Sequence, residues 1–187
     1  HLRIINAVLE YVKRVSAGLM YKKLHGKPYL LCIADSAYQA NDNRTDCIAL
    51  RGHFVFLACA VEGVSFPGGD VQLIDFVSLK LQVISRSAFA AELRNTLEAS
   101  QDLINTAVQL HELYKGPFTA VECARIRDNG EQFLDTVLCG DNEGLFNAVT
   151  KTEPSPGTDG SMQFHVKALR EYLDNHSITT MCWTDNR

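Results

Sequence analysis

The chain has 187 residues and a formal net charge of −4, with 18 Lys and Arg against 22 Asp and Glu. Hydrophobic residues make up 46% of the chain and charged residues 21%, which is typical of a globular domain and not of a disordered chain. No apolar run approaches the roughly 20 residues that a membrane span needs. The acidic balance also disfavours a free-standing, sequence-independent nucleic-acid-binding protein, because such proteins are usually basic.

The six cysteines predict reduced thiols. No two of them form a CxxC pair, and none lies near a histidine at zinc-ligand spacing. Cys32, Cys59 and Cys139 lie inside apolar stretches, where cysteine is commonly a small buried residue. We therefore expect an intracellular protein. The chain shows no signal-peptide pattern, and we expect both of its ends to lie within a longer polypeptide.

A helix opens the predicted order of elements, over residues 2–20. Its apolar residues recur at spacings of three and four: Ile5, Val8, Val12, Val15 and Leu19. A polar segment with Gly and Pro follows and predicts a loop at 22–28.

Three strands are expected next. The continuous apolar run at 29–34 is typical of a strand that is buried on both faces, and Asp35 ends it. Strands joined in sequence by turns predict an antiparallel meander. The other two strands are expected at 47–61 and 71–84, with turns at 41–44 and 63–69.

The hydrophobic period changes after the third strand. Apolar residues from 87 to 114 fit one face of a long helix, which Gly116 and Pro117 end. The segment 117–131 is compatible with a short helix or a loop. The remaining elements are a strand at 133–139, a helix at 143–149, a loop at 152–160, a helix at 163–173 and a strand at 178–183.

Two carboxylates follow apolar runs instead of lying in polar surroundings. They are Asp35, after the first strand, and Asp141, after the run that ends at Cys139. A carboxylate at the edge of a buried strand is costly unless a cation or hydrogen-bond donors compensate it. Two such strands side by side would bring both acids within reach of one hard cation. Glu92, in the first turns of the long helix beside Leu93, is expected to point toward the sheet.

A structural role also explains these acids, and spacing alone favours it. An Asp at a strand end often serves as a turn or cap residue. An acid in the first turn of a helix complements the helix dipole. The spacing of the three residues therefore leaves both interpretations open, a metal site and a structural role.

The order of strand-Asp, meander, helix-Glu and strand-Asp resembles the ribonuclease H fold. The local strings are similar to the ribonuclease H domain of copia-type LTR retrotransposon Pol polyproteins. The opening helix with Gly18-Leu19-Met20-Tyr21 is similar to the segment that joins reverse transcriptase to ribonuclease H in that family. The other strings are Ala34-Asp35-Ser36-Ala37-Tyr38, Gly52-His53-Phe54-Val55-Phe56, Ser85-Arg86-Ser87-Ala88-Phe89-Ala90-Ala91-Glu92-Leu93, Cys139-Gly140-Asp141-Asn142-Glu143-Gly144 and Phe164-His165-Val166.

The resemblance implies an α/β, ribonuclease H-like fold, with a mixed five-stranded sheet flanked by helices. The sheet would hold the three-strand antiparallel meander and two further strands. Residues 1–27 would be a tether helix and linker, and residues 28–187 the ribonuclease H-like domain, truncated at its C-terminus. The family's fourth acid would lie beyond Arg187, and Asp185 lies in the turn before it.

The resemblance also implies an activity, the endonucleolytic hydrolysis of the RNA strand of RNA–DNA hybrids with two Mg²⁺ ions, or Mn²⁺. Asp35 would be shared between the ions, and Glu92 and Asp141 would complete the sites. His165 is a candidate accessory group, or simply a residue at the helix start beside Phe164. The implied partners are the hybrid and an adjoining reverse transcriptase, with no membrane, in a cytoplasmic particle or the nucleus.

The chain departs from the family pattern without losing an acid of the trio. Ala37 stands where the family has a second Asp, Tyr38 where it has Trp, and Lys167 where it has Asp. The segment 116–132 is also longer than expected. These departures leave an alternative, a catalytically inactive module that supports or dimerises reverse transcriptase. A transposase or integrase is disfavoured, because those proteins use the order Asp–Asp–Glu.

Several other residues could contact nucleic acid, but a structural role is favoured for each. They are Lys80, Arg86 and Arg94 as solvated surface charges, Asn142 as a helix cap, and Phe164 and Trp183 as core residues.

Overall fold

The computed structural model of the chain describes residues 21–38, 49–81, 87–151 and 160–184. Several predictions concern positions outside these ranges. They are the helix at 2–20, the turn at 41–44, Cys47, the end of the third strand at 82–84, Arg86, most of the loop at 152–160, and Asp185.

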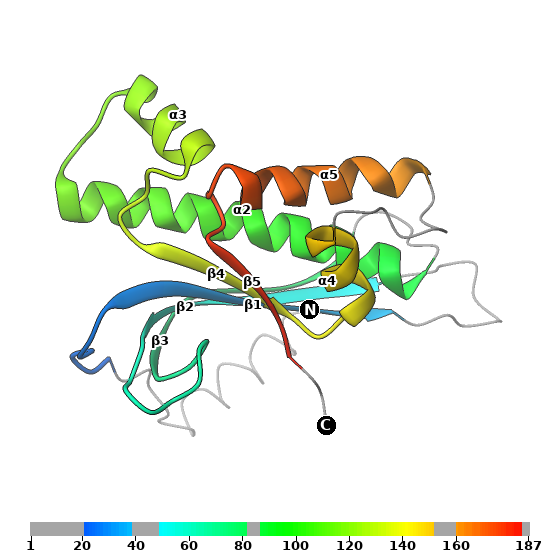
Figure 1. Ribbon diagram of the computed structural model, residues 1–187, viewed down its shortest axis with the longest axis horizontal. Helices are drawn as coiled ribbons and strands as arrows, with labels where there is room; N and C mark the ends of the chain where they lie inside the picture. The colour runs from blue at the N-terminus through cyan, green and yellow to red at the C-terminus, as the bar shows by residue number, and fades with distance from the viewer. Residues whose placement is uncertain (1–20, 39–48, 82–86, 152–159, 185–187) are drawn as a thin grey trace, which may run out of the picture.

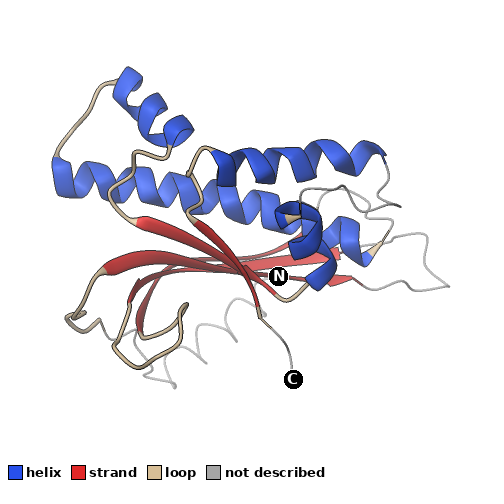
Figure 2. Ribbon diagram, in the orientation of Figure 1, coloured by secondary structure: helices blue, strands red, loops and turns tan. Residues whose placement is uncertain are grey.

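The strands form one mixed sheet in the order β3-β2-β1-β4-β5 (Figures 1 and 2). An antiparallel meander is made by β1 (Pro28–Tyr38), β2 (Ala49–Cys59) and β3 (Asp70–Lys80). The strands β4 (Asp135–Gly140) and β5 (Thr180–Trp183) continue the sheet, β4 parallel to β1 and β5 parallel to β4. The predicted α/β class, with a meander plus two further strands, is confirmed.

The described helices are α2 (Ala88–Lys115), α3 (Ala120–Asn129), α4 (Glu143–Thr150) and α5 (Gly160–Asp174). Figure 1 shows α2 and α5 side by side on one face of the sheet, with α3 near the C-terminal end of α2. The helix α4 packs against α5 and β5. The opposite face of β1, β2 and β3 therefore carries no helix among the described residues.

The main core lies between α2 and the sheet. Fully buried side chains of β1 and β4, such as Leu30 and Leu138, pack against Leu103 of α2. A second cluster joins α2 to α4 and α5 through Leu93, Leu145 and Leu169. The core thereby fixes the start of α2 over the strands that carry the predicted acids.

The caps of α2 explain where this long helix begins and ends. The side-chain oxygen of Ser87 accepts a hydrogen bond from the backbone N–H of Ala90, which satisfies one free donor of the first turn. Gly116 follows the last turn with φ 93°, a backbone angle that glycine adopts without steric cost. Both boundaries lie within two residues of the predicted ones.

The segment left open between helix and loop contains α3. Thr119 and Glu122 form a capping box, in which each side chain bonds the other residue's backbone N–H. Only Ile126 of this helix is buried, so its apolar pattern is weak.

Among the described residues, no helix is long and apolar enough to cross a bilayer.

The first strand differs from its prediction in two ways. Asp35 does not end β1, because the strand continues to Tyr38 by pairing with Ala49–Gly52 at the start of β2. The strand is also not buried on both faces along its whole length, since Ile33 is 43% exposed. Side chains alternate across a strand, and only one face lies under α2 at this position.

The prediction that Phe164 and Trp183 are core residues is wrong. Phe164 is 74% exposed and Trp183 39% exposed. The buried face of α5 contains Met162, Val166 and Leu169. Phe164 lies two residues from both Met162 and Val166, so its side chain is on the opposite side of the helix. Trp183 lies at the exposed end of β5, the edge strand.

Candidate metal centre

Three carboxylates from three separate elements meet at one end of the sheet. Asp35 lies in β1, Glu92 near the start of α2, and Asp141 directly after β4. The register explains why the two aspartates meet: Ile33 pairs with Cys139 across parallel strands, and each acid lies two residues further on. One oxygen of each carboxylate lies within 4.8 Å of the others. We call Asp35, Glu92 and Asp141 the carboxylate cluster.

Burial differs within the carboxylate cluster. Asp35 is exposed, Asp141 is half-buried, and Glu92 is buried, with 8% of its surface exposed. The pKa of Glu92 is raised from 4.5 to about 7, chiefly by burial and also by the neighbouring charges of Asp141 and Asp35. Glu92 is therefore the member of the cluster whose negative charge water compensates poorly.

Ser36 holds the carboxylate of Glu92 in place. Its backbone N–H donates to Oε1 of Glu92 at 3.2 Å, and its hydroxyl donates to the same oxygen at 2.7 Å. Both bonds favour the charged form and lower the pKa of Glu92, although burial has the larger effect. Because Ser36 follows Asp35 directly, β1 supplies one acid and orients a second.

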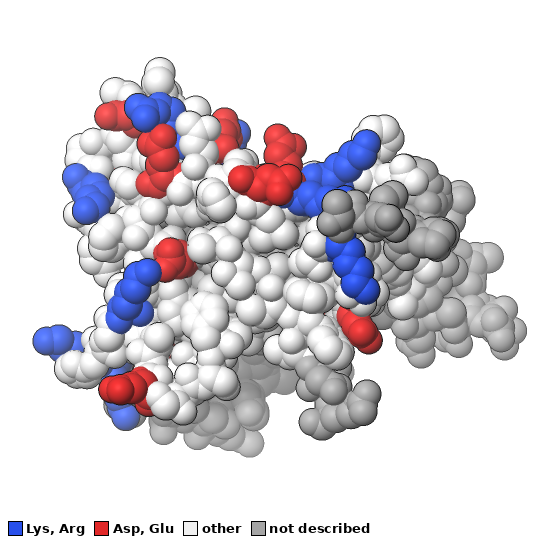
Figure 3. Space-filling model, in the orientation of Figure 1, with Lys and Arg blue, Asp and Glu red and all other residues white. Residues whose placement is uncertain are grey.

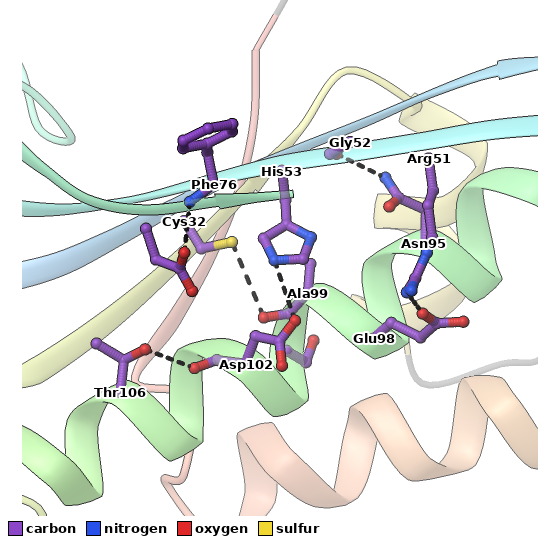
Figure 4. A network of polar contacts seen from close by, with 12 residues as sticks. Cys32, Arg51, Gly52, His53, Phe76, Asn95, Glu98, Ala99, Asp102 and Thr106 are labelled. Atoms are coloured by element: carbon purple, nitrogen blue, oxygen red, sulfur yellow. Dashed lines mark hydrogen bonds and ion pairs between the residues drawn. The ribbon is translucent and has the colours of Figure 1, made fainter. Parts of the chain in front are cut away.

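Asn95 ties α2 to both central strands beside the cluster (Figure 4). Its Nδ2 donates to the backbone carbonyl of Asp35 at 2.7 Å and to that of Gly52 at 3.1 Å. The side chain is fully buried, with 0% exposed, and lies three residues after Glu92. This amide therefore fixes the backbone of one acid relative to the helix that carries another.

Trp183 supports the third acid from the neighbouring strand. Its indole Nε1–H donates to the backbone carbonyl of Asp141 at 3.1 Å. The sequence interpretation did not identify Ser36, Asn95 or this role of Trp183. The available signal for Asn95 was its place among the apolar residues of α2, because a buried amide needs hydrogen-bond partners.

A polar network continues along the interface of β2 and α2 (Figure 4). Arg51 pairs with Glu98, and Nε2 of His53 lies 3.2 Å from Oδ2 of Asp102. His53 is 1% exposed, and burial lowers the pKa of its imidazole in spite of the Asp102 charge. The network joins the strand to the helix and contributes no ligand to the carboxylate cluster.

The other residues considered for catalysis or nucleic-acid contact lie outside the carboxylate cluster. His165 lies in α5, half-buried, and is not one of the residues that meet there. Lys80 is exposed and Arg94 half-buried. Asn142 caps α4, as predicted, because its Oδ1 accepts from the backbone N–H of Leu145 at 2.9 Å.

The carboxylate cluster has the donor set of a hard divalent cation. Mg²⁺ prefers carboxylate oxygens at about 2.1 Å, so opposite ligands on one ion lie about 4.2 Å apart. Adjacent ligands lie closer, about 3 Å apart. The oxygens of the cluster lie within 4.8 Å of one another, so the side chains would have to close in around a single ion. Asp35, Glu92 and Asp141 therefore fit the donor set of a site for a hard divalent cation.

Comparisons with known proteins give matches among solved structures only. No protein-family profile and no curated protein matches the chain. The prototype foamy virus protease–reverse transcriptase aligns with a TM-score of 0.51 at 11% identity, over 89% of this chain and 19% of the viral one. LC11-RNase H1, isolated from compost, gives 0.49 at 10% identity, over 84% of this chain and 85% of that one. LC9-RNase H1, a type 1 ribonuclease H, gives 0.47 at 14% identity, over 88% and 66%.

The strand order and the similarity to the foamy virus structure define the chain as an α/β domain with a ribonuclease H-like fold. At identities of 10–14% the likeness concerns the fold alone. The chain spans 19% of the viral protein and 66% of LC9-RNase H1. Its chemistry must therefore be argued from its own residues.

Proposed function

We propose that this chain hydrolyses the RNA strand of RNA–DNA hybrids, with divalent metal ions held by the carboxylate cluster. The observation that carries the proposal is the meeting of Asp35, Glu92 and Asp141 within 4.8 Å of one another. They come from β1, α2 and β4, in the same order as the acids of the ribonuclease H pattern that the sequence resembles. The ribonuclease H-like fold supports the same interpretation.

The chain's own residues would bind and orient the metal. Asp35, the exposed acid of the cluster, would be shared between two ions, and Glu92 and Asp141 would complete the sites. Ser36 keeps Glu92 aimed at the cluster, and Asn95 keeps the backbone of Asp35 fixed. Divalent ions held there would supply the activation of a water and the stabilisation of the leaving oxygen of a phosphodiester.

The proposed setting is a copia-type retrotransposon Pol polyprotein inside the cell, where residues 1–27 join the domain to reverse transcriptase. The quoted sequence strings support this setting. The charge of the chain supports a role for the neighbouring domain in binding nucleic acid. The net charge is −4, and Figure 3 shows Lys and Arg side chains at separate places among Asp and Glu. Nucleic-acid affinity depends mainly on basic contacts to phosphates, so the reverse transcriptase would supply most of that surface.

Cleavage of a labelled RNA–DNA hybrid tests the proposal. Asp35→Asn should reduce the Mg²⁺-dependent rate by about 100-fold or more, because a neutral amide holds a divalent ion poorly. The matched control is Glu112→Gln, which neutralises an exposed acid near the other end of α2 and should leave the rate unchanged.

Two outcomes would contradict the proposal. Cleavage by Asp35→Asn at the wild-type rate would remove the carboxylate cluster from the mechanism. If a chain that extends past Arg187 and includes the adjoining reverse transcriptase folds but cleaves no hybrid with Mg²⁺ or Mn²⁺, the inactive support module is favoured instead, for which Ala37 and Tyr38 are the relevant departures.

A further inference from the structure

The face of the sheet opposite α2 carries a row of exposed apolar side chains. Ile33, Phe54 and Phe76 are direct partners across β1, β2 and β3. They are 43%, 48% and 62% exposed. Figure 4 shows the ring of Phe76 on the side of the sheet away from His53 and α2. We call these three residues the apolar row.

The apolar row continues a surface that is already covered further along the same strands. On this face Tyr29 and Leu31 of β1 are buried, in a cluster with Ala58 and Val137. The ring of Phe54 stacks on that of Phe56, which packs against the same cluster. Adjoining apolar side chains that stay exposed beside a buried cluster mark a surface where another element docks.

Contacts just before β1 show where the preceding chain reaches the sheet. The hydroxyl of Tyr21 donates to the backbone carbonyl of Leu73 in β3 at 2.9 Å. The side chain of Gln72 donates to the carbonyl of Lys22. The N-terminal segment therefore arrives at β3, the edge strand that also carries Phe76.

Residues 2–20 have the pattern and the length to cover this surface. Their apolar residues recur at spacings of three and four, which gives an α-helix one apolar face. A helix of this length extends about 28 Å. Three neighbouring strands span only about 10 Å from the first to the third.

We propose that residues 2–20 form an amphipathic helix that packs its apolar face on the apolar row. The contact would cover the face of the sheet that no described helix covers, and it would fix the segment against the domain. The proposal does not depend on nuclease activity.

Limited trypsin digestion of the full chain tests this contact, with cleavage after Arg14 followed by mass spectrometry. Phe76→Asp should accelerate that cleavage by about tenfold or more, because a charged side chain in the apolar row releases the segment and exposes it to protease. The matched control is Leu79→Asp. Leu79 is also exposed, at 54%, but it pairs with Arg51, whose side chain contacts Glu98 of α2, so it lies on the other face.

A second variant changes the other side of the same contact, in residues 2–20. Val8→Asp should accelerate cleavage after Arg14 as Phe76→Asp does, and it decides the question alone if Phe76→Asp fails to fold. Unchanged cleavage in a folded Phe76→Asp and in Val8→Asp would overturn the proposal. A wild-type dimer in sedimentation that Phe76→Asp dissociates would also overturn it, since a second copy would then occupy the apolar row.

Discussion

At the scale of single residues, Glu92 is an acid that the fold places where its charge is hard to hold. Its pKa of about 7 exceeds the ordinary 4.5, first through burial and then through the charges of Asp141 and Asp35. The folded state therefore binds this proton more tightly than the unfolded state does. The stability that the group contributes is full below pH 4.5 and is lost as the pH rises through about 7.

Neutralising Glu92 should therefore stabilise the metal-free protein progressively as the pH rises from 4.5 to about 7, and fully above that value. With a chelator present, Glu92→Gln should raise the thermal midpoint at pH 8, by about 2–4 °C for each kcal/mol regained, and leave it nearly unchanged at pH 4, below the ordinary pKa of 4.5. Differential scanning calorimetry at the two pH values measures the effect. An equal shift at both values would show that the charge of Glu92 is not the cause.

Asn95 gives a second prediction at this scale. Asn95→Ala leaves the carbonyls of Asp35 and Gly52 without this donor in a buried place, and should lower the free energy of unfolding by about 2–3 kcal/mol. Urea denaturation measures the loss. The control is Ser100→Ala, on the same helix and equally buried, which bonds only the carbonyl of Thr96 in its own helix and should cost about 1 kcal/mol or less. Equal losses would contradict the bridging role.

The acids and their supports differ in how far the sequence could predict them. Asp35, Glu92 and Asp141 lie in short strings whose order resembles a known pattern, so they could be selected without knowing their distances. Asn95 could not, because its partners are 60 and 43 residues away in the sequence. Only the folded register of β1 and β2 brings those carbonyls to one amide.

At the scale of elements, local signals located most helices and strands to within a few residues. The strand β1 was the main exception, because the polar Asp35 and Ser36 end its apolar run while pairing with β2 continues the strand to Tyr38. The helix α3 could not be separated from a loop, since it buries only Ile126 and starts from a capping box in an exposed segment. The pairing with β2 decides where β1 ends, and the capping box decides where α3 begins. The spacing of the hydrophobic residues shows neither boundary.

The cap of α4 can be tested directly, because Asn142 is also the residue after Asp141. Asn142→Ala removes the acceptor for the backbone N–H of Leu145 and should cost about 1 kcal/mol of stability. Asn142→Ser keeps a capping oxygen and should cost only a few tenths of that amount. Chemical denaturation compares the two variants, and an equal loss in both would show that the cap does not stabilise the helix.

At the scale of the whole molecule, the net charge of −4 is weaker evidence against nucleic acid than composition alone suggests. Three of the acids form the carboxylate cluster, and a bound cation would neutralise part of that charge. The face of the molecule drawn in Figure 3 carries charged side chains of both signs. A domain of this kind suits catalysis beside a basic partner better than independent binding of a hybrid.

The central claim is that Asp35, Glu92 and Asp141 bind divalent metal, and calorimetric titration of Mg²⁺ into the full chain near pH 7 tests it most directly. The account predicts saturable binding with release of protons, because a cation displaces the proton that Glu92 partly holds at this pH. Titrations in two buffers of different ionisation enthalpy measure that release. Asp35→Asn should lose the binding and Glu112→Gln should keep it. Identical binding heats for the wild-type chain and Asp35→Asn would contradict the claim.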